Sequence, residues 1–429
     1  MHNHTSPTRH LPPGIRLIEE VNFLMPVNHT LSNEIPVYLQ QGGSQDIVKV
    51  EFVFKSGSFH QQIPLQAYAM ANLLKNGTLR KTAVEINQLW DFYGASLQID
   101  AQKDIISVGF VSLIRHLPAA MDLLLEMITM PLFPEEELSI FLTNRKQQHL
   151  VDIQKVEYMA RAQFPSLIFG NEHPYGKCLV AEDFDRLTRD DLLNFYKDNI
   201  HPANCVCFVA GKYPPEMTSI LDNSIARFQW HSRQLPGVNT FETQKNAIRK
   251  HHLSKHEALQ SALRIGKSVI SRHHTDHHKL SITNALLGGY FGSRLMQNIR
   301  QDKGYTYGIS SAVVNLVHSA YFFIASQVRK ELASKAIEEV YNEIRSLRLN
   351  PASAHELEML KNYLSASFLR SFDGPFMQGE RFKEILLFNQ DYTFFQQHLN
   401  TIRFITSLDI QETAEKYLHE DNMTELVVG

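Results

Sequence analysis

The sequence predicts an α+β protein made of two similar domains in tandem. With 429 residues, of which 43% are hydrophobic and 20% charged, the chain is too long for one compact core and has enough apolar side chains for two. The stretch that begins at Gly94 lies nearly in step with the stretch that begins at Gly308, about half the chain later. Each runs strand, turn, strand, long amphipathic helix, proline-bearing break and second helix. We therefore expect a tandem duplication of one unit, a mostly antiparallel sheet packed with helices, and two such units that close into a clamp-like half chamber.

Hydrophobic periodicity predicts the elements of each unit. Residues 105–110 alternate between two faces, as in a strand, and residues 121–128 carry apolar side chains at the 3.6-residue rhythm of a helix. A matching strand and helix precede each repeat, at 47–58 and 65–76 in the first half and at 258–270 and 278–289 in the second. Pro64 is suited to the first position of the helix at 65–76, and Gly77 to its C-terminal stop.

The polar stretch that carries Pro236 and Gly237 has no sustained period and is the predicted linker. It divides the chain into an N-terminal domain at 14–233, a linker at 234–250 and a C-terminal domain at 251–429.

Composition excludes several classes of protein. Lys and Arg number 42 against 45 Asp and Glu, a net charge of -3, whereas a nucleic-acid binder shows a basic excess. No run approaches ~18 consecutive apolar residues, so we expect no membrane span. The N-terminus lacks the charged start and apolar run of a signal peptide. The three cysteines, Cys178, Cys205 and Cys207, suit neither a disulfide framework nor a four-ligand zinc site. These features predict a cytoplasmic protein with reduced thiols.

Four spaced motifs run through the chain in a fixed order. They are VEFVFKSGS at 50–58, LQAYAMANLLKNGTLRKT at 65–82, HPYGKCLVAEDFDRLTRDDLLNFYKDNIHPANCVCFVAGK at 173–212 and LLGGYFGSRLMQNIRQDKGYTYGISS at 286–311. Together they resemble the pitrilysin/insulinase-like zinc metallopeptidases, in particular the two-domain type related to mitochondrial processing peptidase. The second motif is similar to the family's zinc helix, G-x-A-H-F-L-E-H followed by G-T-x-x-R. The resemblance covers nearly the whole chain and implies a peptidase-related function.

The chain departs from this family at the residues that carry its chemistry. The positions of the two His ligands in H-x-x-E-H are occupied by Tyr68 and Asn72, and the position of the general-base Glu by Ala71. A phenol and an amide are poor zinc ligands at neutral pH, and alanine cannot exchange a proton. The family's third ligand is a Glu in a later helix, where this chain offers only Asp152. We expect no catalytic residue and no metal in this chain, and interpret 65–76 as a buried helix kept for packing.

A second feature of the family is retained. Arg300 and Tyr307 match the Arg and Tyr that the family uses, from its second domain, to hold the peptide carbonyl beside the metal. Arg offers a permanent charge with several N–H donors, and Tyr adds a directed hydroxyl. Without the resemblance these would be a surface Arg and a strand Tyr; with it, they are the predicted substrate-binding pair.

The segment SRHHTDHHKL is another candidate metal site. His273 with His277, and His274 with His278, have the i, i+4 spacing at which a helix face binds zinc, copper or nickel adventitiously. The segment is expected to be a surface loop that leads into the helix at 278–289, and nothing nearby supplies a general base. We assign it no functional metal.

These observations favour a non-catalytic, substrate-binding subunit of a hetero-oligomeric zinc metallopeptidase that degrades or processes peptides. A partner chain of the same fold would carry H-x-x-E-H and the zinc, and this chain alone would hold no cofactor and cleave nothing. The alternative is a structural or peptide-binding homodimer with no peptidase role. A third, remote possibility is an enzyme whose metal chemistry has moved to the His273–His278 cluster.

Overall fold

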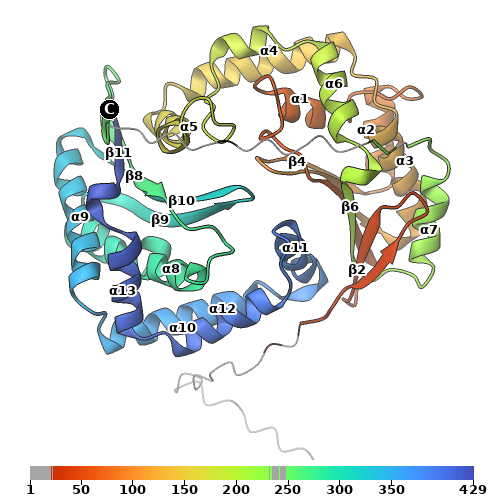
Figure 1. The fold of residues 1–429 in the computed structure, drawn as a ribbon. Helices are drawn as coiled ribbons and strands as arrows, with labels where there is room; N and C mark the ends of the chain where they lie inside the picture. The colour runs from red at the N-terminus through yellow and green to blue at the C-terminus, as the bar shows by residue number, and fades with distance from the viewer. Residues whose placement is uncertain (1–20, 22, 231, 234–240, 242–247) are drawn as a thin grey trace, which may run out of the picture.

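The computed structural model describes residues 21, 23–230, 232–233, 241 and 248–429. Most of the predicted linker, and the predicted start of the first domain at residue 14, lie outside these residues, so the domain boundaries stay a prediction. Within the described residues two lobes face each other, each with its own β-sheet (Figure 1). The α+β prediction is confirmed. No helix in this part of the chain combines the length and the apolar character needed to cross a membrane.

The first lobe contains a six-stranded sheet in the order β1-β2-β6-β3-β5-β4. The β2–β6 pair is parallel, and the other four pairs are antiparallel. The strands are β1 (Val27–Thr30), β2 (Pro36–Gln41), β3 (Ile47–Phe54), β4 (Ser96–Ala101), β5 (Ile106–Leu113) and β6 (Cys205–Gly211). The helices of this half are α1 (Gln66–Leu73), α2 (Ala83–Phe92), α3 (Leu117–Thr129), α4 (Glu135–Asp152), α6 (Arg189–Asn199) and α7 (Met217–Ile225). Alternate residues of β3, such as Val50 and Phe52, join the helices in one core, while Val53 faces the other side of the sheet.

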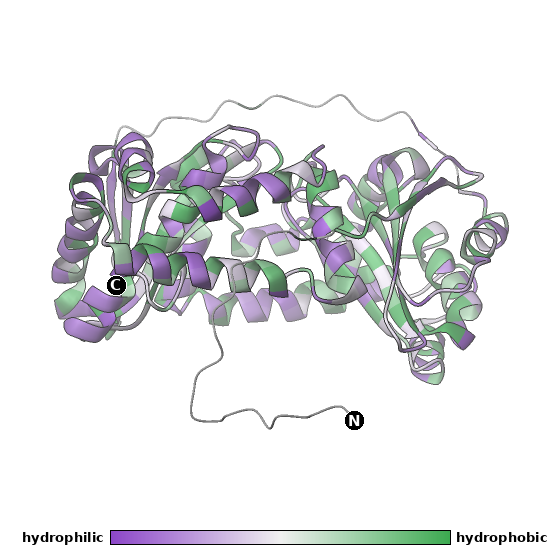
Figure 2. Ribbon diagram, turned by 90° about the horizontal axis from the view of Figure 1, so that it is seen from below, coloured by the Kyte–Doolittle hydropathy of each residue, from purple (hydrophilic) through white to green (hydrophobic). Residues whose placement is uncertain are grey.

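The second lobe contains a five-stranded sheet in the order β7-β11-β8-β10-β9, in which β7 and β11 are parallel. The strands are β7 (Lys250–Leu253), β8 (Gln260–Ser268), β9 (Thr306–Leu316), β10 (Ser319–Arg329) and β11 (Thr424–Val428). The helices are α8 (His277–Asn284), α9 (Ala333–Leu349), α10 (Ala354–Arg370), α12 (Thr393–Phe404) and α13 (Ser407–Tyr417), with π-helical turns η4 (Ala285–Gly289) and η5 (Met296–Asp302). The order β9, β10, α9, α10 repeats the order β4, β5, α3, α4, as the duplication predicts. Hydrophobic residues are prominent in the strands and on parts of the helices in both lobes (Figure 2).

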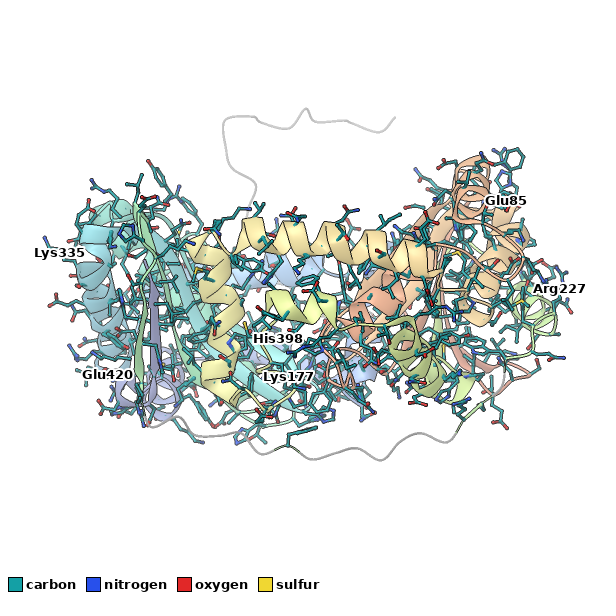
Figure 3. All side chains as sticks on the ribbon, turned by 90° about the horizontal axis from the view of Figure 1, so that it is seen from above. Glu85, Lys177, Arg227, Lys335, His398 and Glu420 are labelled. Atoms are coloured by element: carbon teal, nitrogen blue, oxygen red, sulfur yellow. The ribbon has the colours of Figure 1, made fainter. Side chains whose placement is uncertain are left out.

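Two helices are exchanged between the lobes. Helix α5 (Val156–Phe169) comes from the first half of the chain but packs on β8 and β11 of the second sheet. Helix α11 (Gly374–Leu387) comes from the second half but packs on β2 and β6 of the first sheet, and lies between the two sheets (Figure 1). Seen from above, α4 runs between the lobes, with Glu85 and Arg227 at one end of the molecule and Lys335 and Glu420 at the other (Figure 3). Each sheet is therefore covered partly by the other half of the chain.

Helix α1 begins later than the sequence suggests. It starts at Gln66 rather than at Pro64, because Leu65 adopts a left-handed conformation with φ of 72°. The Gln66 side chain then organises the entry: its Oε1 accepts from Gln62 N at 3.1 Å, and its Nε2 donates to the Asp191 carbonyl at 2.7 Å. The helix also ends earlier than predicted, at Leu73, and Gly77, with φ of 132°, lies in the turn that follows rather than at the helix stop.

Candidate functional site

Helix α1 presents the three residues at the positions of the family's zinc motif. Ala71 is fully buried, and Tyr68 and Asn72 are half-buried. The Asn72 amide is used inside the helix, because its Nδ2 donates to the Tyr68 carbonyl at 2.8 Å. The Arg145 guanidinium, from α4, lies 5.0 Å from the centre of the Tyr68 ring. The face that would hold a metal is thus occupied by a phenol, an engaged amide and a neighbouring cation.

The described residues do not fit a zinc ion at α1. Asp152, the one carboxylate considered as a third ligand, ends α4 and accepts hydrogen bonds from Lys155 Nζ at 2.7 Å and Gln148 Nε2 at 3.0 Å. The hydrogen bond from Lys155, followed by that from Gln148, lowers the pKa of Asp152. Among the described residues, no group of three His, Cys, Asp or Glu side chains is placed to hold a metal ion. Arg145 would also repel a divalent cation.

The structure separates the histidines of the 273–278 segment. His273 and His274 are exposed in the turn before α8, whereas His277 and His278 are buried at its start. Burial, with repulsion from His278 and other neighbouring cationic groups, lowers the pKa of His277 to about 3. Burial and the nearby Arg272 lower the pKa of His278 to about 4. The i, i+4 pairs therefore do not form one helix face.

The buried histidines belong to a polar cluster that the sequence did not reveal. The His278 ring lies 5.3 Å from the ring of His398 on α12, which Figure 3 shows near the middle of the molecule. The Arg272 guanidinium stacks 4.0 Å from the Phe394 ring, and its Nε donates to Gln390 at 2.8 Å. The expectation of a surface loop holds for the first two histidines and is wrong for the last two, because α12 covers them.

Arg300 and Tyr307 lie on either side of the turn that leads into β9. Arg300 is in η5, and its guanidinium lies 4.8 Å over the ring of Phe291, which is 62% exposed. Tyr307 is the second residue of β9 and is 93% exposed. Gly304, with φ of 64°, makes the turn between them, and Tyr305 N donates to the Ile299 carbonyl at 3.0 Å. Within the described residues, no carboxylate forms an ion pair with Arg300. Both side chains are thus available to a ligand, and their role in substrate binding stays a prediction.

Two sheet edges, one of them the strand that carries Tyr307, have backbone groups without a strand partner. Strand β4 pairs with β5 alone, and β9 pairs with β10 alone, so each is the edge of its sheet. An exposed edge offers a row of N–H and C=O groups to which an extended peptide can add. A groove of about 710 Å³ lies between β4 and α11, with Gln98, Asp100 and Lys383 among its lining residues. This groove is the feature of the structure best suited to an extended peptide.

A buried ion-pair network fixes α11 beside this groove. Lys383 Nζ lies 2.8 Å from Glu51 Oε2 and 2.7 Å from Glu380 Oε2, and Lys49 Nζ lies 2.5 Å from Glu380 Oε1. Burial opposes the charge on Glu380, but Lys383 and Lys49 outweigh it, and the pKa of Glu380 is lowered. Burial likewise opposes the charge on Lys383, but Glu51 and Glu380 raise its pKa overall. Sequence reasoning missed this network because its partners lie on opposite halves of the chain.

Comparison with known proteins finds relatives among the M16 peptidases. Residues 186–364 match the model of the peptidase M16 inactive domain. The chain is 22% identical over 357 residues to the uncharacterized zinc protease YmxG of Bacillus subtilis, covering 80% of this chain and 84% of that one. It is 23% identical over 343 residues to the non-peptidase homolog YmxG of Helicobacter pylori, with 78% of each chain covered.

Solved structures share the fold over nearly the whole chain. A peptidase M16 inactive domain from Pseudomonas fluorescens matches with a TM-score of 0.85 at 20% identity, covering 95% of this chain and 98% of that one. A protease from Helicobacter pylori matches with a TM-score of 0.84 at 16% identity, covering 94% and 100%. The resemblance read from the sequence motifs is confirmed: part of this chain matches the peptidase M16 inactive domain, its relatives include proteins named zinc proteases, and it shares the fold of the solved M16 structure.

Proposed function

We propose that this chain is the non-catalytic, substrate-binding subunit of a hetero-oligomeric zinc metallopeptidase. One contrast carries the proposal. The positions of the metal ligands and base hold Tyr68, Asn72 and Ala71, whereas Arg300 and Tyr307 are retained, with Arg300 half-buried and Tyr307 exposed. A chain that had lost every role in peptide handling would have no reason to keep the second pair while losing the first.

The proposed division of labour follows from what each group can do. Arg300 supplies a permanent charge with several N–H donors, and Tyr307 supplies a hydroxyl donor. Such donors stabilise the negative charge that develops on a peptide carbonyl when it is attacked. A partner chain of the same fold would supply the zinc, the general base and the other half of the chamber, and the exposed edges β4 and β9 would hold the extended peptide.

Co-purification from the native source with metal analysis tests the proposal. We expect a stable partner that bears H-x-x-E-H and zinc, no stoichiometric zinc in this chain alone, and higher peptidase activity when the two are combined. Self-association without such a partner would favour the structural or peptide-binding homodimer instead. A tightly bound zinc in the pure chain, or chelator-sensitive cleavage by it, would refute both.

Substitutions at the retained pair test its role. Arg300→Ala and Tyr307→Phe should each lower turnover of the assembled complex by about 10²-fold, the effect of removing one donor to a developing oxyanion, without preventing assembly. Lys335→Ala, on the exposed face of α9, is the matched control and should leave turnover unchanged. Wild-type kinetics for both variants of the pair would remove the role proposed for it.

A further inference from the structure

Three loops from the first half of the chain contact the tip of the β9–β10 hairpin, so that four loops meet there. Three come from the first half of the chain, at residues 57–60, 102–104 and 173–175, and the fourth is the tip itself, at residues 317–318. We name this meeting point the hairpin junction. Figure 1 shows the tip beside the end of β4.

The Asp104 carboxylate joins the two lobes at the junction. Its Oδ1 accepts a hydrogen bond from the Tyr175 hydroxyl, and its Oδ2 accepts from Val317 N at 3.0 Å. The Tyr175 hydroxyl in turn accepts from His318 N at 3.2 Å. Tyr175 is 1% exposed, so its two hydrogen bonds are partly shielded from water, whereas the bond from Val317 N to Asp104 is exposed. The hairpin tip is therefore held through its backbone by one carboxylate and one phenol.

Close packing surrounds these hydrogen bonds. The His318 ring stacks on the Phe59 ring at 4.4 Å, with 25° between the planes. Phe59 N donates to the Lys103 carbonyl at 2.8 Å, which draws the 57–60 loop onto the β4–β5 turn. A Cβ at Gly57 would lie 2.4 Å from the Gln102 carbonyl oxygen, so only glycine permits this approach. The loops of the junction are therefore held together by specific packing and hydrogen bonds.

Two histidines, His60 and His173, make the junction sensitive to protons. Burial, followed by repulsion from His318, lowers the pKa of both His60 and His173, and Asp104 opposes this for His60. The titratable or charged groups that face them from all four loops and from the segment that follows are His60, His173, His318, Asp104, Lys103, Tyr175 and Cys178. Because His60 and His173 take up their protons at lower pH in the folded chain than in the unfolded chain, the junction loses stability as the pH falls below about 6.5, the ordinary pKa of histidine.

The position of the junction links it to the two exposed edges. Strand β4 ends at Ala101, just before the turn that carries Asp104, and β9 ends at Leu316, just before the tip. We propose that the hairpin junction is a latch that holds the β4 and β9 edges at one spacing near neutral pH and lets them separate under mild acid. That the separation admits a peptide rests on the proposed function; the latch itself does not.

Among the described residues, the two exchanged helices are held by contacts of a different kind. Helix α5 meets the second sheet through apolar side chains such as Phe164 and Leu426. Helix α11 is held by lysine–glutamate pairs; burial opposes the charge on Glu380, but Lys383 and Lys49 outweigh it and lower its pKa, so the pairs stay charged in mild acid. The latch should therefore open while both exchanged helices stay in place.

Spin-label distances across the two edges test the latch. Cysteines placed at the exposed Ser96 on β4 and Ser310 on β9 carry the labels, in a chain in which the half-buried Cys178 is replaced by serine. Double electron–electron resonance on this full-length chain should give one narrow distance distribution at pH 7.5 and a longer, broader one at pH 5.5. Identical distributions at the two pH values would overturn the proposal.

Three variants separate the latch from general acid damage. Tyr175→Phe should give the long distances already at pH 7.5, because it removes the hydroxyl that accepts from His318 N, one of the two hydrogen bonds that hold the tip. His318→Gln should lower the midpoint of the pH transition, because it removes the repulsion felt by the other two histidines; an unchanged midpoint would refute their involvement. His256→Gln, at a fully solvated side chain, is the control and should keep the wild-type midpoint. If the distances change as expected but no peptide binds at either pH, the latch stands and the proposed function fails.

Discussion

Replacing Lys383 by methionine tests whether the ion-pair network holds α11 on the first sheet. Methionine keeps much of the aliphatic length of lysine and removes the charge. The Glu51 side chain is 9% exposed and would lose the cation at 2.8 Å. Lys49 would remain 3.4 Å from Glu51 and would compensate in part.

The expected loss of stability is large for a single side chain. Leaving a buried charge without its partner costs about 3–5 kcal/mol, and because Lys49 remains we expect a loss of about 2–3 kcal/mol in the free energy of unfolding. Glu51→Gln combined with Lys383→Met should cost less than the sum of the two, because the partner left behind is no longer charged. Lys335→Met, on the exposed face of α9, is the matched control and should change stability by less than about 0.5 kcal/mol.

Urea unfolding followed by tryptophan fluorescence measures this loss of stability in the first lobe, the lobe that α11 covers. The chain has two tryptophans, and both, Trp90 and Trp230, pack in the core of the first lobe that α11 covers from the other side. The urea midpoint of Lys383→Met should fall clearly below that of the wild type. A midpoint equal to that of Lys335→Met would refute the reasoning.

The pH dependence of the same network has a defined sign. The pKa of Glu380 is lowered, so its contribution is present above about pH 4.5 and is lost as the pH falls through the folded value. The pKa of Lys383 is raised, so its contribution is present below about pH 10.5 and is lost as the pH rises through the folded value. The stability difference between wild type and Lys383→Met should therefore be flat between these limits and shrink outside them.

Two further predictions concern α1 and the hairpin junction. Restoring the motif with Tyr68→His, Ala71→Glu and Asn72→His should give no stoichiometric zinc by calorimetry or metal analysis, because two imidazoles lack a third ligand; one zinc per chain would contradict this. Gly57→Ala should lower the melting temperature, at a cost of about 1–3 kcal/mol from overpacking, whereas Gly308→Ala, with open space at its Cβ, should not; equal melting temperatures for the two variants would contradict the close approach.

Periodic patterns accounted for the fold well, because local side-chain spacing determines them. Ile106, Val108 and Phe110 alternate in the sequence and are all fully buried on one face of β5. The repeat that begins at Gly94 and Gly308 places the same order of strands and helices in both lobes. Two sheets with helices followed from these patterns alone.

Contacts between segments that are far apart in the chain could not be predicted from the sequence. Helix α5 has the composition of an ordinary core helix, and nothing in it indicates that it packs on the sheet of the other half. The Glu51–Lys383 pair joins residues that are far apart in the chain, so no local spacing reveals it. The burial of His277 and His278 depends on Phe394 of α12, which the segment itself could not show. The roles of polar residues that are far apart in the chain can be assigned only when the topology shows which of them are in contact.

At the candidate site, the lost zinc-motif residues and the retained Tyr307 have to be explained together. Three substitutions at Tyr68, Ala71 and Asn72 remove ligands and base, and the structure adds Arg145 beside them, which makes the loss consistent with a helix maintained for packing. Packing does not account for Tyr307, which is 93% exposed on a sheet edge and touches no core. The Tyr307 hydroxyl is therefore free to donate to a ligand, and a peptide carbonyl is the ligand that we propose for it.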